Sequence, residues 1–214
     1  MPRGLGLAVL FVWIAGYTNA FNFMDGINGI AAGQAALTGT GMALLGGLAS
    51  GHWNQPAIGL CLLVAGAAGG FLPHNFPSAR MFMGDVGSVP LGFLLAVLAL
   101  WLAQSCGVWF LVPLTLLHSN FILDTGITLV RRIRRGEPFY KAHREYFYQR
   151  LARAEKSHVF ATACEMGLQC LVFIMMILYI RSGISERIGL AAGVVLLWLA
   201  FFICCEWRFQ RSIK

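Results

Sequence analysis

The run Val-Pro-Leu-Gly-Phe-Leu-Leu-Ala-Val-Leu-Ala-Leu-Trp-Leu-Ala, residues 89–103, contains no charged side chain and lies within an apolar stretch that covers residues 87–104. About 20 apolar residues in a helix cross the hydrocarbon core of a bilayer. This stretch therefore predicts a membrane-spanning helix. The same pattern recurs along the chain and predicts seven spans, at residues 4–20, 34–50, 56–72, 87–104, 108–130, 158–180 and 187–206.

The composition indicates that these spans make up most of the protein. Of its 214 residues, 58% are hydrophobic and only 12% are charged, whereas a soluble domain carries about 25% charged residues. We expect an all-α, polytopic membrane bundle that forms a single domain over residues 1–214. Five of the six cysteines lie inside apolar spans, where a thiol acts as a small hydrophobe, so neither a disulfide framework nor a cysteine metal site is expected.

Lys and Arg residues orient the predicted bundle. If residues 131–157 are cytoplasmic, 13 of the 16 basic residues lie inside and only Arg3, Arg181 and Arg187 lie outside, as the positive-inside rule requires. The net charge of +7 follows from this asymmetry, and no soluble basic domain exists to bind nucleic acid. The orientation places the amino terminus outside the cytoplasm, which leads us to expect further helices upstream.

Three polar stretches, residues 19–28, 74–88 and 131–158, are separated from one another by two predicted spans each. Loops an even number of crossings apart lie on the same side of a membrane. We therefore expect the acids, amides and basic residues of the chain to gather at one cytoplasmic surface.

The first polar stretch contains Asn22, Asp25 and Asn28, which are spaced by three residues and so lie near one face of a helix. Gly26 and Gly29 leave the backbone open to close approach by a ligand. An amide–acid–amide row of this kind can bind a base, a sugar or a hydrated metal ion. The same residues also fit a simple helix entry with asparagine caps, and the carboxylate also fits a structural salt bridge.

The second stretch, Phe82-Met83-Gly84-Asp85-Val86-Gly87-Ser88, offers different chemistry. The carboxylate of Asp85 is a hard oxygen ligand that suits magnesium, which is held by one or two carboxylates together with substrate phosphates. Gly87 and Ser88 offer amides and a hydroxyl to an anion near the start of a helix. Phe82 can stack on a planar base.

The third stretch supplies positive charge. Residues 131–157 form a predicted cytoplasmic basic loop, and residues 139–154 within it have the spacing of an amphipathic helix at the membrane interface. Arg131–Arg135 fit either a substrate contact or charge that only sets the topology, whereas His143 and Arg144 favour a substrate contact. Together with the two aspartates these residues suit phosphoryl transfer, which depends on positioning and charge neutralisation.

Several of these residues match the motifs of a known family. Asn-Phe-Met-Asp-Gly-Ile-Asn-Gly-Ile-Ala (22–31), Phe-Met-Gly-Asp-Val-Gly-Ser (82–88) and Asp124 with Arg131-Arg132 resemble the polyprenyl-phosphate N-acetylhexosamine-1-phosphate transferase superfamily, glycosyltransferase family 4. That superfamily includes the undecaprenyl-phosphate GlcNAc-1-phosphate transferases and the phospho-MurNAc-pentapeptide translocases. Ala142-His143-Arg144 and Tyr148-Gln149-Arg150 are most similar to the branch that initiates O-antigen and related surface polysaccharides.

The resemblance implies a multi-pass enzyme of the bacterial inner membrane with its active face in the cytoplasm. It would transfer a sugar 1-phosphate from a UDP-N-acetylhexosamine to undecaprenyl phosphate, release UMP, and work with Mg²⁺ or Mn²⁺. A homodimer is compatible with the resemblance. The implied catalytic residues are Asp25, Asp85 and His143, with Asp85 as the metal ligand. The implied substrate-binding residues are Asn22, Asn28 near uracil, Asn75, Phe82 stacked on uracil, and Arg144 on phosphate.

The chain departs from the family pattern in two ways. The family carries about four further helices and an adjacent pair of active-site aspartates ahead of this region, so the resemblance predicts that the chain is a fragment or a truncated product. Close relatives also have a second histidine three residues after His143, where this chain has Tyr146. The alternative function is therefore a catalytically inactive fragment or a membrane scaffold.

Other membrane proteins fit the sequence less well. A transporter would place its polar groups near the middle of its helices, and a retinal protein would need a lysine in the last helix. CDP-alcohol phosphotransferases have a longer aspartate pattern that this chain lacks.

Overall fold

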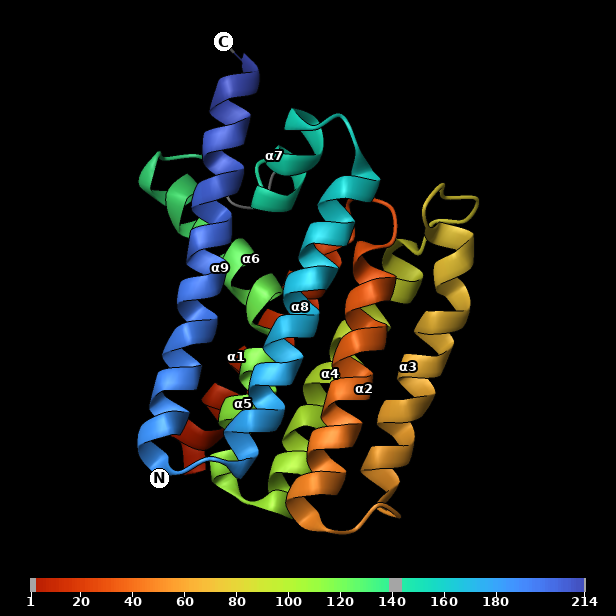
Figure 1. The fold of residues 1–214 in the computed structure, drawn as a ribbon, viewed down its shortest axis with the longest axis vertical. Coiled ribbons are helices and arrows are strands. Elements are labelled where there is room, and N and C mark those ends of the chain that lie inside the picture. Colours follow the sequence, from red (N-terminus) through yellow and green to blue (C-terminus); the bar gives the residue numbers. More distant parts are fainter. Residues whose placement is uncertain (1–2, 139–143, 214) are drawn as a thin grey trace.

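The structure is a computed structural model that describes residues 3–138 and 144–213. The described residues form helices and no strand, which confirms the predicted all-α class. The helices, labelled in Figure 1, are α1 (Arg3–Met24), α2 (Ile30–Ser50), α3 (Pro56–Asn75), α4 (Gly84–Cys106), the short 3-10 helix η1 (Val108–Phe110), α5 (Leu111–Leu117), α6 (Ser119–Arg134), α7 (Phe147–Ala154), α8 (His158–Arg181) and α9 (Ile184–Ile213).

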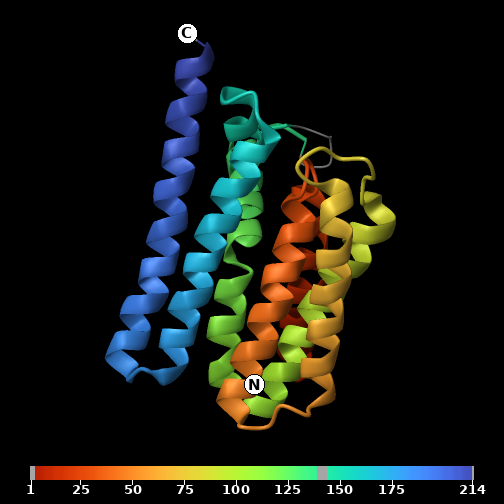
Figure 2. The same ribbon diagram turned by 45° about the vertical axis from the view of Figure 1, so that its right-hand side comes forward.

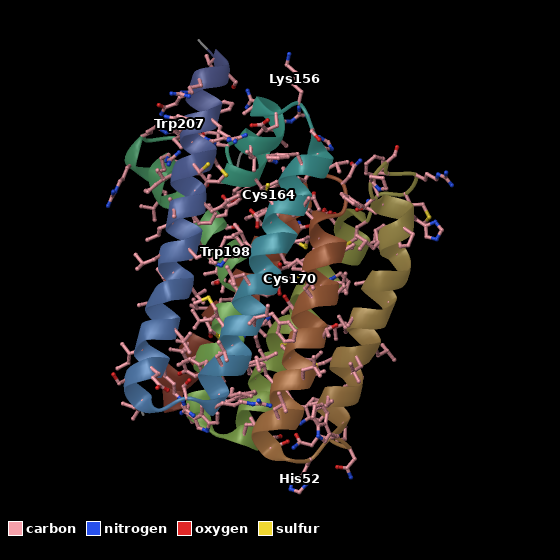
Figure 3. All side chains as sticks on the ribbon, viewed as in Figure 1. His52, Lys156, Cys164, Cys170, Trp198 and Trp207 are labelled. Carbon is pink, nitrogen blue, oxygen red and sulfur yellow. The ribbon has the colours of Figure 1, made fainter. Side chains whose placement is uncertain are left out.

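The long helices run roughly parallel to one axis and alternate in direction, as Figures 1 and 2 show. Residues 25–29, 76–83, 135–138 and 144–157 all lie at one end of the bundle, which we call the loop end. Lys156 and Trp207 mark this end in Figure 3, and His52 marks the opposite end. The predicted gathering of the three polar stretches on one side of the bundle is thus confirmed for the described residues.

Within the described residues, five helices are long and apolar enough to cross a membrane, and a bent pair of helices raises the number to six. The protein is therefore a multi-pass membrane protein, but the predicted count of seven is not confirmed. The difference is α2, which crosses the bundle beside α3 but is rich in Gly, Ala and Thr. Its small residues permit close packing: a Cβ on Gly39 would lie 2.9 Å from the carbonyl oxygen of Cys61.

The prediction of one continuous helix over residues 108–130 is wrong. The chain bends by 72° between residues 108–117 and α6. At the bend, the carbonyl oxygen of Leu117 accepts hydrogen bonds from Gln34 Nε2 of α2 (3.2 Å) and from Gln169 Nε2 of α8 (2.7 Å). A backbone group that leaves helical pairing in a membrane needs another partner. These two amides, distant in sequence, permit the break.

The basic segment at the loop end is more closely packed than an interfacial helix would be. Residues 131–134 continue α6, and the helix predicted over residues 139–154 begins, among the described residues, only at Phe147. Both Tyr148 and Arg150 of α7 are buried. The reason is that α7 packs between α8 and α9, where Arg150 Nη1 forms an ion pair with Glu206 (2.8 Å). All six cysteines are free, as expected.

Candidate active site

The two glycine-flanked aspartate motifs meet at the loop end. Asp25 lies between α1 and α2, close enough to the start of α4 for the backbone N–H of Gly84 to act on its pKa. One turn away, the hydroxyl of Ser88 donates to Asn22 Oδ1 over 2.5 Å. The predicted convergence of the two motifs is therefore found, through contacts between residues about 60 positions apart.

The negative charge of Asp85 acts on Asp25. Burial, opposed by the hydrogen bond from Gly84 and reinforced by the negative charge of Asp85, raises the pKa of Asp25 to about 6. Asp85 itself is exposed in the first turn of α4. Two neighbouring carboxylates of this kind repel each other when both are ionised, and a bound cation would relieve that repulsion.

Asn75 joins the two loops of the site through their backbones. Its Oδ1 accepts from the N–H of Gly29 (2.7 Å), and its Nδ2 donates to the carbonyl oxygen of Met81 (2.7 Å). The side chain is buried, and both of its polar atoms hold protein backbone. Gly29 is required at this contact because its φ is +79° and a Cβ there would lie 2.7 Å from the ring of Phe76.

Asn28 contacts the loop before α4 and also His158, a residue that the sequence analysis did not assign to the site. Its Nδ2 donates to the carbonyl oxygen of Pro77 (3.2 Å), and its Oδ1 lies 3.3 Å from Nδ1 of His158. Thr162 Oγ1 also donates to the carbonyl oxygen of Asn28 (2.7 Å). His158 opens α8 directly after Ser157, whose hydroxyl caps the helix by accepting from Phe160 N. That capping pattern was the only available sequence signal, and it does not indicate contact with Asn28.

The remaining predicted residues are less constrained by the protein. Phe82 is 79% exposed and stands free at the loop end, so its ring is accessible to a ligand. Arg144 is exposed, and its carbonyl oxygen accepts from Arg153 (3.4 Å). His143 lies outside the described residues.

The carboxylates of Asp25 and Asp85 are the acidic donors of this site. Among the described residues no group of three or more His, Cys, Asp or Glu side chains could hold a metal ion. Asp85 offers an exposed carboxylate, and Asp25 offers a partly buried one. Mg²⁺ keeps several waters and is bound by one or two carboxylates plus substrate phosphates, so two acids are sufficient.

An apolar groove of about 690 Å³ follows the outer face of α6 toward the loop end. Arginines close the groove at that end, and one of them, Arg134, is exposed and forms no ion pair with any described residue. The groove is lined by Ile122, Leu123, Gly126, Ile127, Val130, Arg131, Arg134 and Arg135. Its chemistry suits an isoprenoid or acyl chain that ends in an anionic group.

The chain is similar to several known proteins. Residues 1–103 match the sequence model of glycosyl transferase family 4. Over 90% of its length the chain is 29% identical to a probable undecaprenyl-phosphate N-acetylglucosaminyl 1-phosphate transferase of Bacillus subtilis (strain 168), of which it covers 49%.

Two further relatives carry related names. The chain is 33% identical to the decaprenyl-phosphate N-acetylglucosaminephosphotransferase of Mycobacterium leprae (strain TN), over 65% of this chain and 39% of the relative. It is 40% identical to the phospho-N-acetylmuramoyl-pentapeptide-transferase of Synechococcus sp. (strain WH7803), over 57% of this chain and 32% of the relative.

The chain is thus similar to glycosyl transferase family 4 over residues 1–103, and to polyprenyl-phosphate hexosamine-1-phosphate transferases over more than half of its length. It spans about half the length, or less, of the curated relatives it matches.

Proposed function

We propose that the protein transfers a sugar 1-phosphate from a UDP-N-acetylhexosamine to undecaprenyl phosphate at the cytoplasmic face of a bacterial inner membrane. The observation that carries this proposal is the contact between the Asp25 and Asp85 motifs at the loop end. The names of the relatives support a polyprenyl phosphate acceptor and an N-acetylhexosamine donor. Initiation of O-antigen or another surface polysaccharide is part of the proposal.

In this reaction an oxygen of the lipid phosphate bonds to the β-phosphorus of the nucleotide sugar. The bond from that phosphorus to the bridging oxygen breaks, and UMP leaves with the bonding electrons. A phosphate monoester retains one proton below about pH 6. Asp25, whose pKa lies at about 6, would accept that proton from the incoming lipid phosphate.

The other residues would bind and orient the two substrates. Asp85 would hold Mg²⁺, which when bound supplies positive charge to the diphosphate. Phe82 offers an exposed ring to uracil, and Asn28 and Asn22 would add polar contacts to the nucleotide sugar. The apolar groove along α6 suits the isoprenoid chain, with Arg134 available to its phosphate.

The decisive experiment replaces Asp85 by Asn in the purified chain reconstituted in lipid, with UDP-GlcNAc, undecaprenyl phosphate and Mg²⁺. Because Asn keeps the shape but lacks the charge, we expect UMP release to fall by at least about 100-fold, which corresponds to about 2.7 kcal/mol of transition-state stabilisation. Glu186→Gln, at the opposite end of the bundle, is the matched control and should leave turnover unchanged.

Two outcomes would contradict the proposal. Full turnover by Asp85→Asn would remove the metal assignment. If the unaltered chain released no UMP while remaining folded, the alternative would be favoured, namely a membrane protein of this family without transferase activity of its own.

A further inference from the structure

The loop that carries Asp25 is held in place by a helix from a distant part of the chain. The hydroxyl of Tyr148 in α7 donates to the carbonyl oxygen of Phe23 (3.2 Å), two residues before Asp25. A Cβ on Gly26 would lie 2.2 Å from the Tyr148 oxygen and 2.8 Å from Nε2 of Gln149. The first turn of α7 therefore rests directly on the backbone of this loop.

The position of α7 is in turn fixed by Asp124, a buried carboxylate that the proposed chemistry does not use. Asp124 Oδ1 accepts from the backbone N–H of Phe147 (3.0 Å), and its Oδ2 accepts from that of Tyr148 (3.2 Å). Thr128, one turn further along α6, donates to Oδ1 (3.3 Å). A carboxylate that caps the first turn of a helix satisfies amides that otherwise lack partners.

Asp124 lies on the helix that also lines the apolar groove. Its neighbours Leu123 and Gly126 line that groove, whereas the Asp124 side chain is buried and faces α7. The contacts thus run without interruption from α6, through Asp124 and the start of α7, to Tyr148 and the Asp25 loop. A displacement of α6 would be passed to Asp25 by these hydrogen bonds.

We propose that Asp124 and Tyr148 are positioning residues, which set the place of Asp25 relative to the groove along α6. The inference rests on the proposed function, because it assigns Asp25 to the chemistry and the groove to the lipid substrate. Neither residue touches a reacting atom. Their role is to keep the nucleotide-binding loop and the lipid-binding helix in one fixed geometry, and an error of about 1 Å in such a geometry can cost about 100-fold in rate.

The first test measures structure without activity. Hydrogen–deuterium exchange of residues 23–30 reports how firmly the loop is held, because exchange follows local opening. Tyr148→Phe removes only the hydroxyl, and Gly26→Ala separates the loop from α7. Both should accelerate exchange in this segment while leaving α3 and α9 protected. The matched controls, Tyr179→Phe and Gly167→Ala in α8, should not; a Cβ at Gly167 meets nothing within 4 Å.

The second test measures turnover. Tyr148→Phe and Asp124→Asn should each lower kcat about 10- to 100-fold and change KM for UDP-GlcNAc less, as expected when reacting groups are misplaced rather than lost. Because the two residues act in one chain of contacts, the double variant should be little worse than the poorer single variant. If the two residues acted independently, the fold-losses in kcat of the single variants would instead multiply in the double variant.

Unchanged exchange of residues 23–30 in Tyr148→Phe would overturn the inference, whatever the activity, and so would multiplicative effects in the double variant. If neither the wild type nor any variant released UMP, the proposed function would fail while the exchange experiment still decided whether the loop is held in this way. Should Asp124→Asn not fold, Tyr148→Phe and Gly26→Ala still test the same contacts.

Discussion

At the scale of single residues, the site depends on which polar atoms are already used within the protein. Both polar atoms of the Asn75 side chain form hydrogen bonds with backbone groups of two loops, whereas Asp85 and Phe82 are exposed at the loop end. Residue type alone does not separate these cases, because an asparagine suits a ligand contact and a backbone bridge equally well.

Glu145 illustrates how charge acts at this scale. Burial alone would raise the pKa of Glu145, but the hydrogen bond from Arg135 and the charges of Arg135, Arg132 and Arg150 hold it below the ordinary value. Arg132 Nη1 lies 3.2 Å from Glu145 Oε1. A carboxylate with a depressed pKa stabilises the fold above its unfolded pKa and loses that contribution as the pH falls through its folded pKa.

We therefore predict that Glu145→Gln lowers the free energy of unfolding by on the order of 1 kcal/mol at pH 7. The difference from wild type should shrink below about pH 4.3, where an unperturbed glutamate is half protonated. Thermal unfolding in detergent from pH 7 to pH 3.5 measures it, with Glu186→Gln as the control. A difference that stays constant over this range would contradict the prediction.

At the scale of elements, the broken span is the main feature that hydropathy does not encode. Residues 108–130 are apolar enough for one helix, yet the chain bends at His118. The bend is possible because side-chain amides from two other helices donate hydrogen bonds to the carbonyl oxygen of Leu117. Gln34 also accepts from Asn120 Nδ2 (2.8 Å), so it contacts both sides of the break. The bend brings α6 to α7 and thereby Asp124 to the loop end.

Replacement of Gln34 by Leu should therefore destabilise the protein by about 1–3 kcal/mol, because it leaves buried polar groups of the break with fewer partners. Unfolding by a denaturing detergent, followed by circular dichroism, measures the loss. Gln104→Leu in α4 is the matched control, since Gln104 is exposed and its replacement should have little effect. Equal stability of the two variants would show that Gln34 does not support the bend.

At the scale of the whole molecule, the alternation of helices places the loops of the site together and away from residues 51–55. The positive-inside rule predicts that the loop end is cytoplasmic, because 13 of the 16 basic residues belong to segments predicted to lie on that side. The expected orientation of the bundle in the membrane and the gathering of the site loops at one end both follow from the same topology.

This topology predicts a labelling pattern for single cysteines in a background without the native ones. Ser78→Cys and Lys156→Cys, both at exposed positions of the loop end, should react with an impermeant maleimide only when the cytoplasmic side is open. Asn54→Cys, exposed at the opposite end, should react from the other side. Labelling of Ser78→Cys and Lys156→Cys from opposite sides would refute the shared surface.

By itself, the sequence determined the membrane class, the helical architecture and the gathering of the polar stretches. It did so because apolar runs about 20 residues long have few alternatives in a bilayer, and because parity of crossings fixes which loops share a side. The family motifs around Asp25 and Asp85 could also be recognised from the sequence, because the residues of each motif are close together in the chain.

The tertiary structure alone decided how those motifs are held. Four features depend on contacts between residues at least 23 positions apart. They are the break at His118, the capping of α7 by Asp124, the contact of Tyr148 with the Asp25 loop, and the contact of His158 with Asn28. Each depends on a hydrogen bond whose donor and acceptor meet only after the helices pack, so no local sequence pattern predicts it.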